Sequence, residues 1–200
     1  SIGLAGQCPG DFYSLADNSA SPAVSKVVET NSINKKPANN QVYRWTPASL
    51  ALSGDACASP ISLTYSVGSC SPSTATVVGA TATGSPAAPA CWSPATSSND
   101  VWFTVTKPLG QTSMQVSTDF ATAACNPFGT AVAVYSGTCG TPVLVGCADN
   151  NGIQNSANAI ITLTGLPNAA TTYLIRVEGD NLTVGNFQIC VRDVINDDCA

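Results

Sequence analysis

The stretch "VWFTVT" at residues 101–106 decides the fold prediction. Val101, Phe103 and Val105 are apolar, and the alternate positions hold Trp102, Thr104 and Thr106. Successive side chains of a β-strand point to opposite faces, so the three apolar residues share one face. The stretch therefore predicts a strand with one buried face.

The same period of two recurs along the chain after residue 54. It places Met114 and Val116 inward in "TSMQVST", and Phe187, Ile189 and Val191 inward in "NFQICVR". Gly, Pro, Asn and Ser break the sequence between such runs, and no amphipathic helix of convincing length competes with them. The remaining strand candidates are "ISLTYS", "TATVVG", "TAVAVYS", "PVLVGC", "NAIITLTG" and "TYLIRVE". We expect an all-β protein, an antiparallel β-sandwich of eight or nine strands.

Composition limits the partners. A chain of 200 residues can bury roughly 70% of its unfolded surface in one core. Seven Lys and Arg against twelve Asp and Glu leave no basic stripe, which argues against nucleic acid as a partner. No stretch of 18 uncharged apolar residues is present, so no membrane span is predicted.

The cysteines indicate an oxidising compartment. Nine cysteines with no histidine favour disulfides over zinc, and hence a secreted or cell-surface protein. The first residues show no signal peptide, so we interpret the chain as mature or internal. Because nine is odd, at least one thiol is free or bonds outside the molecule, and Cys8 and Cys199 are the first candidates.

Residues 1–53 differ from the rest because strand patterns are scarce there. This stretch is either an ordered N-terminal arm or a loose linker, and "QVYRWTPASLAL" favours an arm. Tyr43 and Trp45 fall on one face of a candidate strand, where aromatic side chains of this size need a surface to cover. That surface is either the chain's own sandwich or a neighbouring unit.

The last residues repeat an internal motif. "NDDCA" at 196–200 is similar to "GDACA" at 54–58, and "SIGLAGQC" at the start of the chain resembles the residues directly after the internal copy. Such self-similarity indicates tandem repeats. We therefore predict an arm or linker over 1–53, a sandwich domain over 54–194, and the start of a following repeat or junction over 195–200.

Three runs carry a resemblance to a known family: "DVWF" at 100–103, "YSGTCGTPVLVGCAD" at 135–149, and "YLIRVEGDNLTVGNFQIC" at 173–190. Residues 54–200 resemble the jelly-roll repeats of large secreted surface proteins of Bacteroidetes-like bacteria, which are related to the pre-peptidase C-terminal (PPC-like) domain. The resemblance implies a jelly-roll sandwich that occurs in tandem beside adhesive, fibrous or catalytic modules and is not itself a catalyst.

The resemblance also bears on calcium. Family members often have an Asp where this chain has Gly129, so one oxygen ligand is missing. The side chains of Asp149, Asn150 and Asn151 suit a hard cation, but a turn explains Asp-Asn-Asn-Gly equally well. We predict no cofactor, with calcium as the one ion to consider.

Three disulfides are predicted. Cys139 and Cys147 flank "GTPVLVG", which we interpret as a hairpin that brings the two within bridging distance. The resemblance suggests that Cys57 pairs with Cys190 and that Cys70 pairs with Cys91. Cys125 is then left over, either bonded to Cys8 or buried as a thiol.

Catalytic constellations are scarce in the sequence. Without histidine, Ser-His-Asp and Cys-His arrangements cannot form. Glu29 and Glu178 are the only glutamates, and the adjacent Asp197 and Asp198 would point to opposite sides of an extended chain. We expect a protein that is not an enzyme.

Two functions remain in view. The first is an extracellular structural subunit or repeat of a surface fibre or adhesin, joined to copies of itself or to adjoining repeats by Cys8, Tyr43, Trp45 and Cys199. The alternative is an accessory module of a secreted enzyme that binds polysaccharide or cell-surface protein. In that case Trp92 and Trp102 would form a platform for sugar rings, although burial in the domain explains both tryptophans more simply.

Overall fold

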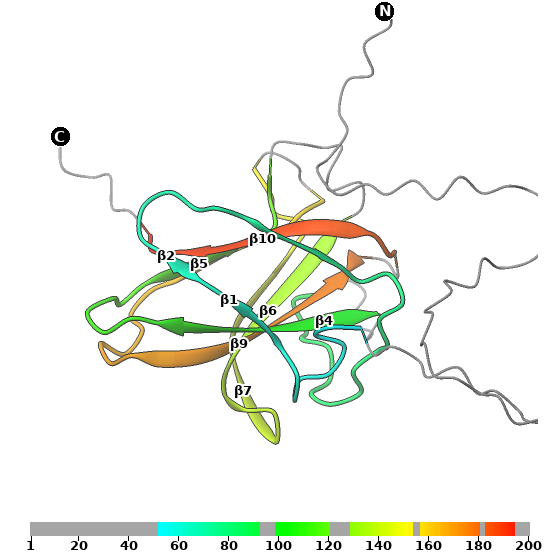
Figure 1. Cartoon of the computed structure of the whole chain (residues 1–200), viewed down its shortest axis with the longest axis horizontal. Coiled ribbons are helices and arrows are strands. Elements are labelled where there is room, and N and C mark those ends of the chain that lie inside the picture. Colours follow the sequence, from blue (N-terminus) through cyan, green and yellow to red (C-terminus); the bar gives the residue numbers. More distant parts are fainter. Residues whose placement is uncertain (1–51, 93–98, 121–128, 154–156, 181–182, 195–200) are drawn as a thin grey trace, which may run out of the picture. The chain divides into compact units, whose positions relative to one another are not determined.

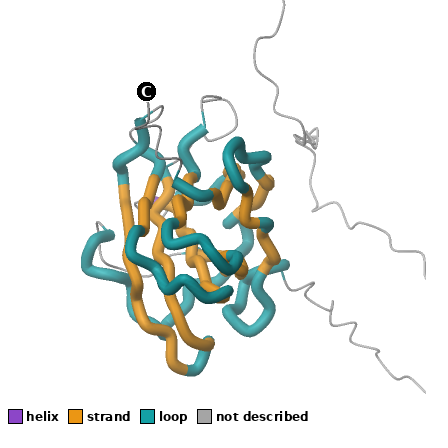
Figure 2. The backbone as a smooth tube through the Cα atoms, turned by 90° about the vertical axis from the view of Figure 1, so that its left-hand side faces the viewer, coloured by secondary structure: helices purple, strands orange, loops and turns teal. Residues whose placement is uncertain are grey.

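The computed structural model describes residues 52–92, 99–120, 129–153, 157–180 and 183–194. These ranges form ten strands joined by turns and loops, with no α-helix among the described residues (Figures 1 and 2). The strands are β1 (Ile61–Leu63), β2 (Tyr65–Ser66), β3 (Ser73–Thr76), β4 (Asp100–Lys107), β5 (Met114–Ser117), β6 (Thr130–Thr138), β7 (Thr141–Asp149), β8 (Ile160–Leu163), β9 (Thr171–Gly179) and β10 (Asn186–Arg192).

The strands form two sheets that pack face to face (Figure 1). The first sheet has the order β1-β4-β9-β6-β7, and the second has the order β2-β10-β5-β8, with β3 also paired to β10. From β4 onward the chain alternates between the sheets, apart from the β6–β7 hairpin. The prediction of an all-β sandwich is confirmed.

The tenth strand arises because "ISLTYS" divides into two. β1 pairs with β4 in the first sheet and β2 pairs with β10 in the second, with Thr64 alone between them. Both pairings are parallel, so the sheets are mixed and not wholly antiparallel as predicted. The extended segment passes from one sheet to the other without reversing, and it therefore keeps one direction in both.

The core between the sheets follows the predicted alternation. Val101, Phe103 and Val105 of β4 are buried in it, and Phe103 meets Phe187 of β10 edge to face at 6.1 Å between ring centroids. The other inward residues of the long strands are Met114, Val116, Val132, Val134, Ile161, Leu163, Tyr173, Ile175, Val177, Ile189 and Val191. Since apolar burial drives folding at about 25 cal/mol per Å², this cluster is the main source of stability.

Candidate functional surfaces: a covered face and an open groove

The outer face of the first sheet carries a second apolar cluster. It consists of Trp92, Trp102, Ala131, Ala133, Tyr135 and Leu174. Trp102 lies directly opposite Arg176 across β4 and β9, and Ala133 lies opposite Arg176 on the other side. The small alanines of β6 leave room for Trp92, whose indole Nε1 donates to the Val132 carbonyl at 3.3 Å. A face that a sandwich usually leaves to solvent is therefore covered.

Arg176 is fully buried at the centre of this cluster. Its Nη2 donates to Asp100 Oδ2 at 2.8 Å and to the Thr83 carbonyl at 3.2 Å, and its Nη1 donates to the Pro86 carbonyl at 3.0 Å. The guanidinium carbon lies 5.2 Å from the Trp92 ring centroid and 5.8 Å from that of Trp102. A buried guanidinium is tolerated only when it is paired and hydrogen-bonded in this way.

Thr83 lies in the loop before β4, which covers this cluster, and it donates hydrogen bonds to the same Asp100 carboxylate. Its backbone N–H and its hydroxyl donate to the two oxygens of Asp100 at 2.8 and 2.6 Å, and the indole N–H of Trp102 donates to the Thr83 hydroxyl at 3.0 Å. The loop before β4 thus supplies part of the polar environment of the ion pair. Without that loop, Arg176 and Asp100 would face solvent.

Tyr135 belongs to this cluster, and its ring centroid lies 5.6 Å from that of Trp102. Burial raises the pKa of its phenol above the usual value, and the nearby positive charge of Arg176 opposes part of that rise. The phenol is therefore neutral over the whole physiological pH range.

Two disulfides hold the covering loops in place. Cys57, in the loop before β1, bonds Cys139 in the β6–β7 turn with 5.7 Å between Cα atoms. Cys91, in the loop before β4, bonds Cys147 of β7 with 6.3 Å between Cα atoms. Both bridges therefore tie a loop to the β6–β7 hairpin.

The third disulfide joins Cys70 to Cys190, with 6.1 Å between Cα atoms, in the second sheet. Cys70 lies between β2 and β3, and both strands pair with β10, which contains Cys190. The topology therefore brings these two cysteines together although 120 positions separate them.

All three predicted pairings are wrong, although the same six cysteines are bonded. Cys139 and Cys147 cannot bond each other because β7 begins at Thr141, so "TPVLVGCAD" is one strand and not a hairpin. At about 3.3 Å per residue their Cα atoms would lie roughly 25 Å apart. The Cys57–Cys190 and Cys70–Cys91 pairings fail because Cys57 and Cys91 lie over the first sheet and Cys190 lies in the second.

Burial, the simpler explanation of the two tryptophans, holds, and the sugar platform considered for the alternative function does not form. Trp92 is 3% exposed and Trp102 is 0% exposed, so neither ring can stack on a sugar. Both rings instead flank the guanidinium of Arg176. A sugar would have to displace the covering loops to reach them.

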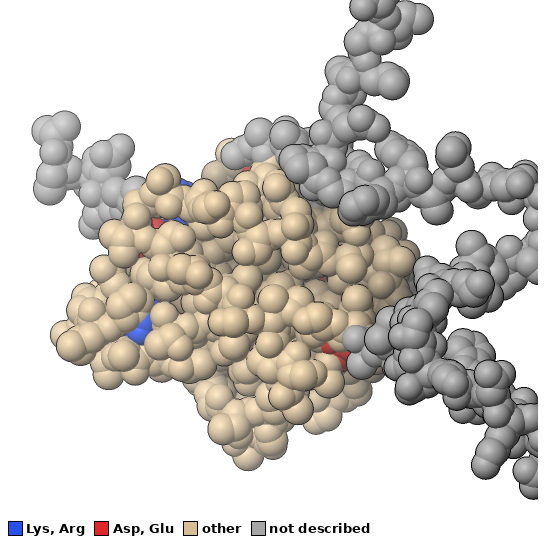
Figure 3. Space-filling model, viewed as in Figure 1, with Lys and Arg blue, Asp and Glu red and all other residues tan. Residues whose placement is uncertain are grey.

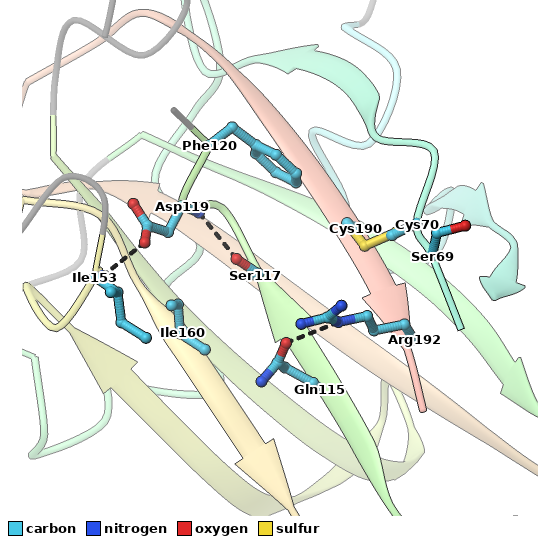
Figure 4. Close-up of a pocket in the computed structure, with 10 residues that line it drawn as sticks. All are labelled: Ser69, Cys70, Gln115, Ser117, Asp119, Phe120, Ile153, Ile160, Cys190 and Arg192. Atoms are coloured by element: carbon cyan, nitrogen blue, oxygen red, sulfur yellow. Dashed lines mark hydrogen bonds between the residues drawn. A yellow bond between two sulfur atoms is a disulfide. The ribbon is translucent and has the colours of Figure 1, made fainter. Parts of the chain in front are cut away.

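No described loop closes over the outer face of the second sheet, which contains a groove of about 340 Å³ (Figure 4). Its floor is formed by outward residues of β5 and β10, and the neighbouring loops supply its walls. The lining residues are Ser69, Cys70, Gln115, Ser117, Asp119, Phe120, Ile153, Ile160, Cys190 and Arg192. It is polar along the strands and apolar at Phe120 and Ile153.

A row of polar side chains crosses this face. Arg192, Gln115 and Thr162 are direct neighbours on β10, β5 and β8. Arg192 Nε donates to Gln115 Oε1 at 2.9 Å, and Gln115 Nε2 donates to the Thr162 hydroxyl at 3.2 Å. The row fixes the amide of Gln115 and the orientation of the guanidinium.

Arg192 is the one accessible cation of the described sandwich. Lys107 and Arg176 are both 0% exposed, and Lys107 donates to the carbonyls of Pro108, Gln111 and Ala169. The side of the molecule seen in Figure 3 is accordingly almost free of charged side chains. Arg192, which is partly exposed, is therefore the guanidinium that this surface leaves accessible.

Of the residues considered for calcium, Asp149 is the last residue of β7, and Asn150 and Asn151 follow it in the chain. Asn151 Nδ2 donates to the Ile160 carbonyl and its Oδ1 accepts from the Ile160 N–H, both at 2.7 Å, and Asn150 has a φ of 49°. At Gly129 a Cβ would lie 2.8 Å from the Ala157 carbonyl oxygen and 2.9 Å from Asp180 Cβ, so the site has no room for the family's aspartate. The described residues contain no group of three His, Cys, Asp or Glu placed to hold a metal.

Several predicted residues lie outside the described ranges. They are Cys8, Tyr43, Trp45, Cys125 and Cys199, together with residues 1–51 and 195–200 of the predicted arm and junction. In the described part no helix is long and apolar enough to cross a bilayer.

Sequence reasoning missed Arg192, Gln115 and Arg176 as site residues. The alternation of "NFQICVR" and "TYLIRVE" already placed both arginines away from the core. It gave no sign that one outer face is covered and the other is open.

Fold and disulfides together define a disulfide-stapled β-sandwich, a class typical of proteins outside the cytosol. Residues 1–47 match a family model described as NIDO related. No curated protein and no solved structure matches the chain. The disulfides and the NIDO-related match are compatible with an extracellular protein. The match does not reach residues 54–200, whose resemblance to PPC-like repeats stays a prediction.

Proposed function

We propose that the chain is a non-catalytic structural module of an extracellular assembly, a repeat or subunit of a surface fibre or adhesin. In this proposal the stretch 1–53 of one unit joins the sandwich of the next. The observation that carries the proposal is the exposed edge strand β7, which pairs with β6 alone among the described strands.

β7 has the features of an acceptor for another strand. It is nine residues long, and Val143 and Leu144 are 62% and 45% exposed. No charged residue occurs from Thr141 to Ala148, although sheet edges are usually protected by charge. Pro142 protects only the start of the strand. An unpaired edge of this kind is a template for strand addition.

Charge supports a donor from the N-terminal stretch. Residues 1–53 hold four Lys and Arg against three Asp and Glu, whereas residues 54–200 hold three against nine. Opposite net charges favour the encounter of one unit's N-terminal stretch with another unit's sandwich. The candidate strand "QVYRW" at 41–45 supplies Tyr43 and Trp45 as contact residues in this proposal.

The proposal is tested with the full chain by sedimentation velocity and negative-stain microscopy. Wild type is expected to associate as its concentration rises, and Val143→Lys to weaken association at least tenfold because a charge then lies on the acceptor edge. Leu109→Lys is the matched control, since Leu109 is 74% exposed but lies in the β4–β5 turn. A chain that stays monomeric at every concentration, or equal effects of the two variants, would refute the proposal.

A further inference from the structure

We infer that the groove on the outer face of the second sheet is a binding site for a sugar unit that carries a carboxylate, such as a uronic acid within a glycan. The inference is independent of strand addition at β7, which belongs to the other sheet. The inferred site lies on a different surface from Trp92 and Trp102, and it would bind a sugar through charge and hydrogen bonds and not by stacking on tryptophan.

The groove has the size of a small-ligand site. Its volume of about 340 Å³ lies at the lower end of the range of about 300–1,000 Å³ that is usual for such sites. Figure 4 shows Arg192 and Gln115 at one end and Phe120 with Asp119 at the other, on either side of Ser117. A ligand of one or two sugar rings would span these groups.

Arg192 supplies the charge recognition. Its Nε donates a hydrogen bond to Gln115 Oε1, and its two terminal nitrogens have no hydrogen-bond partner among the described residues. Those nitrogens form the planar edge of the guanidinium that binds a carboxylate through two parallel hydrogen bonds. Because Gln115 is itself held by Thr162, this edge is oriented before any ligand arrives.

Hydroxyl recognition comes from the floor and rim. The Ser117 hydroxyl oxygen accepts a hydrogen bond from the Asp119 backbone N–H at 3.1 Å. Its own hydrogen can therefore be donated to a ligand. Ser69 is an exposed hydroxyl at the rim, and the half-buried ring of Phe120 offers an apolar surface to the C–H face of a sugar. Polar groups at fixed positions beside an apolar wall are typical of small-molecule sites.

The strand order favours a sugar over an extended peptide. β5 lies between β10 and β8, and β10 lies between β5 and the strands β2 and β3. The backbone groups of the groove floor are therefore already paired, so a peptide cannot add to them as a strand. Recognition has to use side chains, and these are one guanidinium, one amide and hydroxyls.

The charge of the sandwich restricts the ligand further. The described residues hold seven Asp and Glu against three Lys and Arg, and of these cations only Arg192 is accessible. A polyanion would be repelled by this field. One carboxylate placed on Arg192, in a ligand that is otherwise neutral and rich in hydroxyl groups, fits the surface.

The test uses the full chain and calorimetry or chemical-shift titration with methyl glucuronide and methyl galacturonide. Methyl glucoside, methyl galactoside, acetate and a short peptide with a free C-terminal carboxylate are the comparison ligands. We expect at least one uronide to bind, its neutral counterpart to bind at least tenfold more weakly, and Arg192→Gln to reduce uronide binding at least tenfold. Thr106→Ala, on the exposed surface of the first sheet, is the control and should bind as wild type does.

Arg192→Lys keeps the positive charge but removes the planar guanidinium, so this variant should have only part of the wild-type affinity for the uronide. An unchanged melting temperature for each variant shows that the fold is intact. The inference is overturned if neutral sugars bind as well as uronides, if acetate or the peptide binds as tightly, if Arg192→Gln has no effect, or if no uronide binds.

Discussion

On the outer face of the first sheet Arg176 is 0% exposed and paired with Asp100, whereas on the second sheet Arg192 stays accessible beside Gln115. Both arginines occupy outward positions of regular strands. They differ because loops with two disulfides cover the first face, and no described loop closes over the groove on the second. The same residue type is therefore buried in an ion pair on one face and partly accessible among the described residues of the other.

The loop before β4 also stabilises the buried charges of the first sheet. Burying a guanidinium and a carboxylate costs several kcal/mol per ion unless partners replace the lost water. Thr83 and Pro86 of the covering loop provide such partners. Loop closure and ion-pair burial thus depend on each other, and variants on the two faces can separate their contributions.

The largest effect is expected from removing one disulfide from each face. By loop closure, Cys91→Ala/Cys147→Ala and Cys70→Ala/Cys190→Ala, which open loops of 56 and 120 residues, should each lower the free energy of unfolding by about 4 to 5 kcal/mol. Only the first variant should also shift tryptophan emission to the red in the folded state, because its loop covers Trp92 and Trp102. Equal emission shifts in the two variants would contradict the distinction between the faces.

Replacing the buried arginine comes next. Arg176→Met keeps an apolar stem but leaves the Asp100 carboxylate buried without its cation, so we expect a loss of about 3 to 5 kcal/mol in urea unfolding. The double variant Arg176→Met/Asp100→Leu also removes the Asp100 carboxylate and should recover part of that loss, while Glu178, which lies 3.9 Å from Arg176 Nη2, stays charged. If Arg176→Met were as stable as wild type, the loop before β4 would not depend on the buried Arg176–Asp100 pair for stability.

A smaller loss should follow Trp102→Phe. The substitution removes the hydrogen bond from the indole to Thr83 and weakens the contact with the guanidinium, which together are worth about 1 to 2 kcal/mol. Thermal unfolding would measure it. A phenylalanine variant with unchanged stability would mean that neither the indole hydrogen bond nor the contact with the guanidinium contributes measurably.

The smallest effect on stability is expected at the open face. Arg192→Met removes a half-exposed side chain with one hydrogen bond to Gln115, so the free energy of unfolding should change by less than about 0.5 kcal/mol. Urea unfolding of Arg192→Met and of Arg176→Met compares the same substitution on the two faces. A loss as large as that at Arg176 would show that Arg192 is structural.

The sequence predicted the strands well because period-two alternation acts locally. All nine predicted segments are strands, and Val101, Phe103 and Val105 are in the core as expected. The division of "ISLTYS" between two sheets was missed, since a parallel pairing depends on distant partners, β4 and β10.

The candidate site was predicted less well. Burial of Trp92 and Trp102 was the simpler expectation and it holds, but the sequence did not show which loops cover them. Arg192 and Gln115 become a pair only because β10 and β5 are neighbours in the second sheet. No local pattern contains that information.

By itself the sequence determined the all-β class and the buried face of each strand, because these follow from alternation, and its cysteine content predicted disulfides. The tertiary structure alone decided which cysteines bond, since a disulfide needs Cα atoms about 6 Å apart whatever their separation in sequence. It also decided that Arg176 is enclosed and Arg192 accessible. Strands specify faces locally, but what covers a face depends on the path of loops that begin far away in the chain.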